Sequence, residues 1–205
     1  MMERVARYHI PKSRCRVETR AGNSRFITTI APAGSVAEAQ AFLQEIRGEM
    51  PDATHHVYAF RVGHGNSVSE GMSDDGEPSG TSGPPTMAVV RGSGLGDVAL
   101  VTTRYFGGTK LGTGGLVAAY TAAAQAAFRE LETEEKVRRV ACALNVPYSI
   151  LEMVRKALDA NEALIDGETF DAEVHLQFQI PEERVAALSD TIRNMTAGRV
   201  SLQTL

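Results

Sequence analysis

Apolar residues in the first third of the chain follow the spacing of strands and then of a helix. Segments 16–20 and 26–30 flank a Gly-Asn turn and predict a β-hairpin. Ser35 lies three residues before Glu38, which is the pattern of a capping box, and the apolar residues after it recur at helical spacing. The sequence therefore predicts a helix after Ser35. The alternating segment 55–62 predicts a further strand.

The middle of the chain loses this periodicity and becomes rich in glycine. Fourteen of the 19 glycines fall in this stretch, and residues 63–83 are expected to form one long irregular loop, an uncommon feature that is usually functional or disordered. Residues 107–115 are expected to form a second glycine-rich loop. Between the loops we expect a short helix over 84–91, opened by two prolines, and a buried strand over 98–103. An alanine-rich helix is expected over 116–131.

A second set of elements follows the charged segment 132–137, which is expected to be a linker. Their order is strand, helix, strand, strand, helix, strand, which is that of a ferredoxin-like domain. Ser149 is expected to cap the first helix. The sequence thus predicts a mixed α/β (α+β) chain, with an α/β domain at residues 1–134 and a ferredoxin-like βαββαβ domain at residues 135–205. The expected elements are 137–146, 149–160, 164–170, 174–180, 182–195 and 200–205.

Composition places the chain among ordinary globular proteins, with 43% hydrophobic and 22% charged residues. No stretch approaches the roughly 18 consecutive apolar residues of a membrane helix, and the N-terminus lacks the pattern of a secretory signal. Cys15 and Cys142 lie far apart and form no disulfide framework. We therefore expect a cytoplasmic protein with no membrane partner.

Charge is unevenly distributed along the chain. The net charge of −4 gives the whole chain no general attraction for nucleic acid. Within residues 1–25, however, seven basic residues stand against Glu3 and Glu18. Such a segment is either a contact for a phosphate backbone or an ordinary solvated strand and terminus, and both interpretations stay open. The basic residues are Arg4, Arg7, Lys12, Arg14, Arg16, Arg20 and Arg25.

The first candidate site is the acidic part of the first glycine-rich loop. Its three carboxylates are compatible with a divalent cation or with acid and base catalysis, although the spacing of an EF-hand is missing. The same residues also fit a turn-rich loop whose side chains bond to backbone amides, or a loop shaped for recognition. As a binding surface, it would comprise Asp74, Asp75, Gly76, Glu77, Pro78, Gly80, Thr81 and Gly83.

The second candidate site runs from the end of a predicted strand, through glycines, to the start of a helix. Free amides and the helix dipole attract anions at such a place, and two basic residues add positive charge. Two aromatic rings offer stacking surfaces for bases. Alternatively, the glycines only permit tight turns and close packing. The residues are Arg104, Tyr105, Phe106, Gly107, Gly108, Lys110, Leu111, Gly112, Gly114 and Gly115.

Motifs of several other functions do not fit. No Walker sequence is present, and residues 92–97 fail the dinucleotide-binding pattern because Asp97 stands in place of its last glycine. His55 and His56 leave opposite faces of a strand and cannot bind one metal together, whereas His64 is expected near the acidic loop. We name no catalytic residue, no metal ligand and no cofactor.

Two sequence blocks carry a resemblance to a known family. The runs SDDGEPSGTSG (73–83) and RGSGLGDVALVTTRYFGGTKLGTGGLVAAY (91–120) resemble the signature of the IMPACT family. NSRFIT (23–28) and HHVYAF (55–60) resemble its earlier blocks, and residues 137–205 are similar to the small C-terminal domain of bacterial members. One departure is the Gly22-Asn23 turn, where members often carry lysine.

The resemblance implies a fold and a function. The N-terminal domain would share an α/β fold with a ribosomal protein domain and a domain of elongation factor G, and the C-terminal domain would be ferredoxin-like. Eukaryotic relatives regulate translation initiation by interfering with activation of an initiation-factor kinase. We therefore expect a non-enzymatic regulator that binds RNA, the ribosome, or a translation factor or other regulatory protein through its glycine-rich loops, with Arg104 and Lys110 meeting phosphate.

Two other interpretations remain open from the sequence. One is a hydrolase or transferase that acts on a small substrate with Asp74, Asp75 or Glu77 as base or metal ligand. The other is a protein-interaction scaffold whose acidic loop docks a basic partner.

Overall fold

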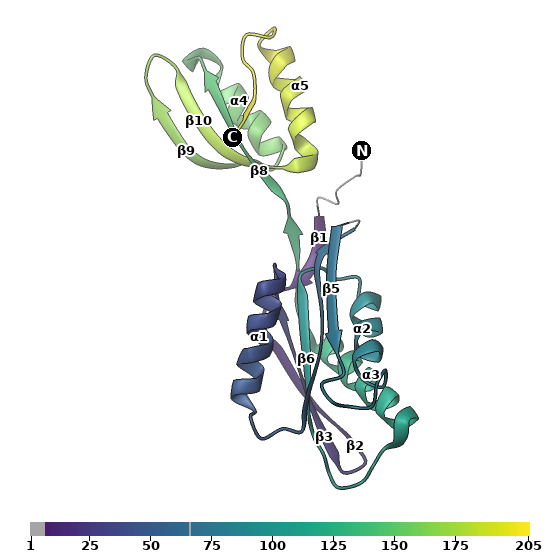
Figure 1. The fold of residues 1–205 in the computed structure, drawn as a ribbon. Coiled ribbons are helices and arrows are strands. Elements are labelled where there is room, and N and C mark those ends of the chain that lie inside the picture. The colour runs from purple at the N-terminus through teal and green to yellow at the C-terminus, as the bar shows by residue number, and fades with distance from the viewer. Residues whose placement is uncertain (1–6, 66) are drawn as a thin grey trace. The chain divides into compact units, whose positions relative to one another are not determined.

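The computed structural model describes residues 7–65 and 67–205 (Figure 1). The chain divides into two compact units, residues 1–136 and 137–205, called here the N-terminal and C-terminal units. Within these described residues, every strand pairing in the two larger sheets is antiparallel, and five α-helices accompany the sheets. The mixed α+β class predicted from the sequence is confirmed.

A five-stranded antiparallel sheet forms the centre of the N-terminal unit. Its third strand is buried along nearly its whole length, as expected of an apolar strand with neighbours on both sides. The hairpin predicted at the Gly-Asn turn is confirmed. In spatial order, the strands are β2 (Cys15–Ala21), β3 (Ser24–Pro32), β6 (Val98–Tyr105), β4 (His55–His64) and β5 (Ser67–Ser73).

Helices cover both faces of this sheet. Helix α1 (Val36–Glu49) packs on one face against a cluster that includes Ala99 and Val101 of β6. Helices α2 (Gly83–Gly92) and α3 (Gly112–Glu130) cover the other face, where alternate residues of β6 contribute to a second cluster. The alanines of α3 place little bulk between that helix and the sheet.

Three segments of the N-terminal unit differ from the sequence-based expectation. Residues 67–73 of the expected loop form the edge strand β5, which pairs with β4. The expected linker is strand β7 (Thr133–Val137), which pairs with β1 (Arg7–Pro11), a strand that the sequence pattern did not reveal. Strands β1 and β7 were missed because each gains its backbone partners from a distant segment. Strand β5 was missed because its residues are mostly polar or small and lack apolar alternation. Helix α3 begins four residues earlier than expected.

The C-terminal unit has the ferredoxin-like order predicted for it. Four antiparallel strands are arranged β11-β8-β10-β9, and two helices pack against a core of aliphatic residues around Phe178. Short 3₁₀ turns at 148–150 and 182–184 precede the helices, so Ser149 does not cap the first one as expected. The elements are β8 (Arg139–Val146), α4 (Leu151–Ala160), β9 (Leu164–Phe170), β10 (Val174–Pro181), α5 (Val185–Met195) and β11 (Gln203–Thr204).

Within the described ranges, no helix combines the length and the apolar character that crossing a bilayer requires.

The N-cap predicted at Ser35 is confirmed, and Glu38 takes part in it, although its carboxylate binds the amide before the cap. The N–H of Glu38 donates to the hydroxyl of Ser35 at 3.1 Å, and the Glu38 carboxylate accepts from the N–H of Gly34 at 2.9 Å. The Ser35 hydroxyl therefore satisfies an amide that the first turn of a helix leaves without a partner, whereas the Glu38 carboxylate binds the amide of the residue before the cap.

Replacing Ser35 with alanine should lower the free energy of unfolding of the N-terminal unit by about 1 kcal/mol, because the amide of Glu38 loses its acceptor. Ser149→Ala is the matched control and should cost less than about 0.5 kcal/mol in the C-terminal unit, since no cap bond is lost. Urea unfolding, followed by hydrogen exchange at core amides of each unit, measures both changes. Equal losses in the two variants would contradict the assignment of the cap.

Candidate functional site

A buried ion pair joins the acidic loop to the strand that leads into the second glycine-rich loop. Arg104 at the end of β6 donates from Nη1 to Oε1 of Glu77 at 2.6 Å. The hydroxyl of Tyr120 on α3 donates to the same oxygen at 2.8 Å. The side chains of Arg104 and Glu77 are only 5% and 3% exposed. The acidic loop is therefore fixed to β6 and α3 by a charged contact that water barely reaches.

Arg104 is enclosed on its other sides as well. Its Nη2 donates to the hydroxyl of Ser24 at 3.1 Å, and its guanidinium lies 5.4 Å from the ring of Phe26 and 5.5 Å from that of Phe106. This burial contradicts the expectation that Arg104 meets phosphate. The residue instead positions the loops, because charge, hydrogen bonds and cation–π contacts all hold it inside the protein.

Tyr120 shows the electrostatic consequence of this network. Burial raises the pKa of its phenol above the usual range, and the neighbouring Glu77 carboxylate raises it further. The phenol thus stays protonated at physiological pH and serves as a hydrogen-bond donor. No role as a base follows from its position.

Asp74 organises the backbone of the acidic loop. Its carboxylate accepts from the amides of Gly80 at 2.8 Å, Ser82 at 3.0 Å and Gly83 at 2.7 Å, and from the Ser82 hydroxyl at 2.7 Å. Desolvation by burial acts to raise the pKa of Asp74, but these hydrogen bonds together outweigh it, and the pKa is lowered. Asp74 therefore closes the loop just before α2, as the turn-forming interpretation predicts.

Asp75 points toward a different set of partners. One carboxylate oxygen accepts from the backbone N–H of His56 at 2.6 Å, and the other accepts from Arg47 of α1 at 2.5 Å. Its backbone has a φ of 45°, a conformation that non-glycine residues adopt uncommonly. Asp74, Asp75 and Glu77 thus serve three separate structural contacts and do not converge on one point.

The remaining expected residues of the acidic loop divide by exposure. Thr81 and Gly83 are buried, and the Thr81 hydroxyl donates to the carbonyl of Pro78 at 2.6 Å. Gly76, Pro78 and Gly80 are exposed. In the part of the chain that the structure describes, no group of three or more His, Cys, Asp or Glu side chains is arranged to hold a metal.

His64 does not lie by the acidic loop as expected. Its ring stacks on Tyr8 with centroids 5.0 Å apart, and its Nε2 lies 3.1 Å from the carbonyl oxygen of Gly94. The strand β5 separates His64 from the loop along the chain, which is why a short sequence distance misled.

Two positions of the second loop require glycine for different reasons, one because of steric crowding and the other because of its backbone conformation. A Cβ on Gly107 would lie 2.0 Å from the backbone oxygen of Asn23, so this position admits no side chain. Gly112 begins α3 with a φ of 72°. By contrast, a Cβ on the exposed Gly114 would meet no atom within 4 Å and its φ is not in the left-handed region. The fold of the described residues gives no steric reason for glycine at 114.

The second loop leaves a surface that we call the tip, which comprises Phe106, Gly108, Lys110, Gly112 and Gly114. Phe106 is 45% exposed, although the Arg104 guanidinium lies over its ring. Lys110 is exposed, and no residue that the structure describes pairs with it. Helix α3 starts without a side-chain cap or an acidic residue in its first turn, so its terminal amides remain open to an anion.

Three other expected residues lie closer to the protein. Tyr105 donates its hydroxyl to Asp52 at 3.1 Å, and the guanidinium of Arg25 covers its ring at 4.6 Å. Leu111 packs on the apolar cluster under α3, and Gly115 is half-buried. Of the two residues expected to stack, Phe106 is exposed and Tyr105 is half-buried.

The basic segment near the N-terminus is mostly neutralised by acidic neighbours. Arg14 bonds to Glu45 and Glu49, and Arg16 also bonds to Glu49. Arg20 and Arg25 pair with Glu18, and Lys12 pairs with Glu132. Arg4 lies outside the described residues. The solvated-strand interpretation therefore fits this segment better than a phosphate contact does.

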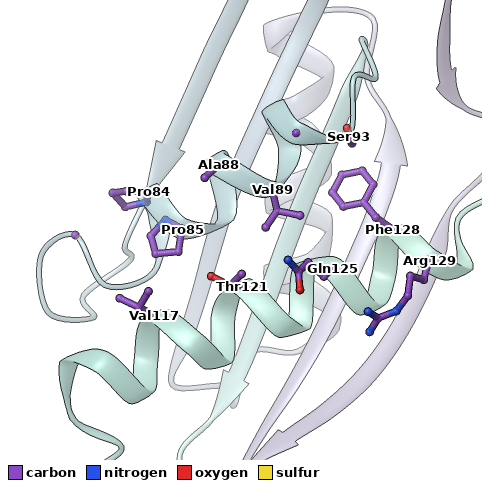
Figure 2. Close-up of a pocket in the computed structure, with 12 residues that line it drawn as sticks. Pro84, Pro85, Ala88, Val89, Ser93, Val117, Thr121, Gln125, Phe128 and Arg129 are labelled. Atoms are coloured by element: carbon purple, nitrogen blue, oxygen red, sulfur yellow. The ribbon is translucent and has the colours of Figure 1, made fainter.

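An apolar groove between α2 and α3 was missed by the sequence analysis (Figure 2). Its lining is mainly apolar and comes from both helices, with polar side chains of Ser93, Thr121, Gln125 and Arg129 among the apolar ones. The signal on α3 was weak, because only Val117 and Phe128 among its lining residues are apolar, and the alanine-rich sequence around them concealed it. The labelled lining residues are Pro84, Pro85, Ala88, Val89, Ser93, Val117, Thr121, Gln125, Phe128 and Arg129.

Comparison with known proteins supports the sequence resemblance over nearly the whole chain. Residues 22–128 match the Impact N-terminal domain, and residues 144–199 match a domain of unknown function, DUF1949. A Haemophilus influenzae protein named "IMPACT family member" is 38% identical over 202 residues, covering 98% of each chain.

The chain belongs to the IMPACT family. An Escherichia coli relative, "IMPACT family member YigZ", is 37% identical over 194 residues, covering 94% of this chain and 95% of the relative. A solved structure titled "Crystal structure of an hypothetical protein" has a TM-score of 0.70 and 36% identity, and covers 98% of both chains. The two named IMPACT relatives align with nearly the whole of this chain, and their names state no molecular activity.

Removing Glu77 should be among the costliest single changes in the N-terminal unit. Glu77→Ala leaves the buried Arg104 without its counter-charge, and we expect a loss of about 3–5 kcal/mol in the free energy of unfolding. Glu18→Ala is the control, since it removes exposed pairs and should cost less than about 1 kcal/mol. Urea unfolding of both variants measures these losses. Equal losses in the free energy of unfolding would contradict the structural role of the Glu77–Arg104 pair.

The lowered pKa of Asp74 predicts a dependence of stability on pH. The carboxylate is more acidic in the folded chain than in the unfolded chain, so its contribution is present above the unfolded pKa and is lost as pH falls through the folded pKa. Wild type should therefore lose more stability than Asp74→Asn as pH drops from neutral to below the usual pKa of aspartate. Unfolding curves measured across that range test this. Parallel pH profiles would show that Asp74 is not the group responsible.

Proposed function

We propose that this protein is a non-enzymatic, translation-associated regulator that binds RNA through the tip of its N-terminal unit. The observation that carries the proposal is that Phe106, Lys110 and the uncapped start of α3 follow one another along the chain and are exposed. Lys110 supplies charge for a phosphate, the helix amides add donors, and the Phe106 ring offers a stacking surface.

The glycines of the tip support this proposal. Gly108, Gly112 and Gly114 have open space where a Cβ would lie, so a backbone of RNA can approach the peptide groups closely. Gly114 is the most informative of the three, because neither its φ nor a neighbour within the unit calls for glycine.

The location of the carboxylates disfavours a hydrolase or transferase. Asp74 and Asp75 accept hydrogen bonds from the backbone, and Glu77 is buried against Arg104 and Tyr120. A general base or a metal ligand needs an oxygen that can reach a substrate or an ion. These three side chains instead stabilise the loop.

The groove between α2 and α3 favours a second candidate, the binding of a regulatory protein or translation factor. Its lining is mainly apolar, which suits a protein side chain better than a nucleic acid (Figure 2). Retention of a bound protein after nuclease treatment, and its loss on Val117→Asp, would favour this candidate over RNA.

Lys110→Ala should weaken binding of a single-stranded RNA oligonucleotide of about ten nucleotides and lower the slope of log affinity against log salt by roughly 1. Lys12→Ala is the control with the same charge change, and it should leave both quantities unchanged because Lys12 pairs with Glu132. Fluorescence anisotropy over a salt series measures both. An unchanged slope in Lys110→Ala would contradict the phosphate contact.

Phe106→Ala should weaken the same RNA by about 1–3 kcal/mol through lost stacking, while the salt slope stays as in wild type. The same anisotropy series gives both quantities. A changed slope with unchanged affinity at low salt would argue against a stacking role for this ring.

A further inference from the structure

Strand β9 forms an open edge of the sheet in the C-terminal unit (Figure 1). It pairs with β10 on one side, and no described strand lies on its other side. Along an edge strand, alternate amide and carbonyl groups face outward and are available to a further strand. Seven residues of β9 are long enough to pair with an extended peptide.

Large apolar side chains on this edge are unusually exposed. Leu164 and Phe170 are each 56% exposed and Ile165 is 42% exposed. The register places Leu164 opposite Gln179 on the open face of the sheet, and Ile165 opposite the buried Phe178 on the helix-covered face. The edge therefore presents apolar surface on both faces, as a strand does when a neighbour is missing.

The same segment is strongly acidic. Residues 164–173, LIDGETFDAE, contain four acidic residues and no basic residue. Glu168 pairs with Arg155 of α4 at 2.6 Å. Within the described chain, the other three, Asp166, Asp171 and Glu173, have no cationic partner. The edge thus carries uncompensated negative charge beside its apolar side chains.

This charge selects among the possible occupants. RNA is excluded by repulsion between phosphate and carboxylate. A second copy of the strand is disfavoured, because antiparallel pairing centred on Gly167 would place Asp166 of each copy opposite Glu168 of the other. A bulge at Asp166, where the register with β10 shifts, also discourages self-pairing. A strand of another protein that carries lysine or arginine is attracted by the carboxylates and avoids the like-charge pairs of self-association.

We propose that β9 is a docking edge for an extended segment of a partner protein in which lysine or arginine alternates with apolar residues. Main-chain hydrogen bonds to β9 supply part of the binding. The basic side chains meet Asp166, Asp171 and Glu173, and the apolar ones cover Leu164, Ile165 and Phe170. This surface lies in the C-terminal unit and does not depend on RNA binding by the tip.

The test uses the full-length chain and three synthetic peptides of about ten residues. One alternates Lys and Val, a second alternates Lys and Pro with the same charge, and a third alternates Glu and Val. We expect the Lys-Val peptide to bind at least about tenfold more tightly than either of the others, since only it combines strand-forming amides with positive charge. Hydrogen exchange of β9 amides should slow on its addition.

Matched variants separate charge from apolar contact. Asp166→Lys combined with Glu173→Lys should weaken Lys-Val binding about tenfold at low salt. Asp159→Lys combined with Asp190→Lys, exposed acids of α4 and α5, is the control with the same change in net charge and should bind as wild type. Leu164→Ser combined with Phe170→Ser should also weaken binding, while circular dichroism stays unchanged because both side chains are already half exposed.

Three results would overturn the proposal. Equal binding of the Lys-Val and Lys-Pro peptides would reduce the effect to non-specific charge attraction. Protection from exchange outside β9 would place the peptide elsewhere. A concentration-dependent dimer that protects β9 without any peptide would identify a second copy as the occupant.

Discussion

The buried pair of Glu77 and Arg104 is the interaction on which the arrangement of the N-terminal unit's loops depends. Each charge is almost fully removed from water, and each is compensated by the other and by Tyr120 or Ser24. A buried pair of this kind adds little net stability over an apolar equivalent, but loss of one member is costly. Its effect is to hold the glycine-rich acidic loop in one arrangement against β6 and α3.

This arrangement divides the candidate residues into two groups. Asp74, Asp75, Glu77 and Arg104 work inward and hold the loops. Phe106 and Lys110 remain outward, next to the open amides of α3. A charged residue in a glycine-rich loop is therefore as well suited to organising the loop as to touching a ligand, and burial decides between these roles.

Much of the fold was predictable from residues that act locally. The N-cap at Ser35, the Gly-Asn hairpin and the βαββαβ order all depend on neighbours in sequence, and the structure has each of them. Strands β1, β5 and β7 were missed because their partners lie far along the chain or their side chains are mostly polar. The burial of Arg104 was equally hidden, since Glu77, Ser24 and Tyr120 come from three distant segments.

RNA binding by the tip is tested most directly by ultraviolet crosslinking in cells, followed by mass spectrometry of the peptides that carry RNA. We expect crosslinks on the segment that contains Phe106 and Lys110, and none on the peptide that contains Glu77. RNA attached only to the C-terminal unit, or a protein that carries no RNA at all, would contradict the central claim that the glycine-rich tip is a nucleic-acid surface.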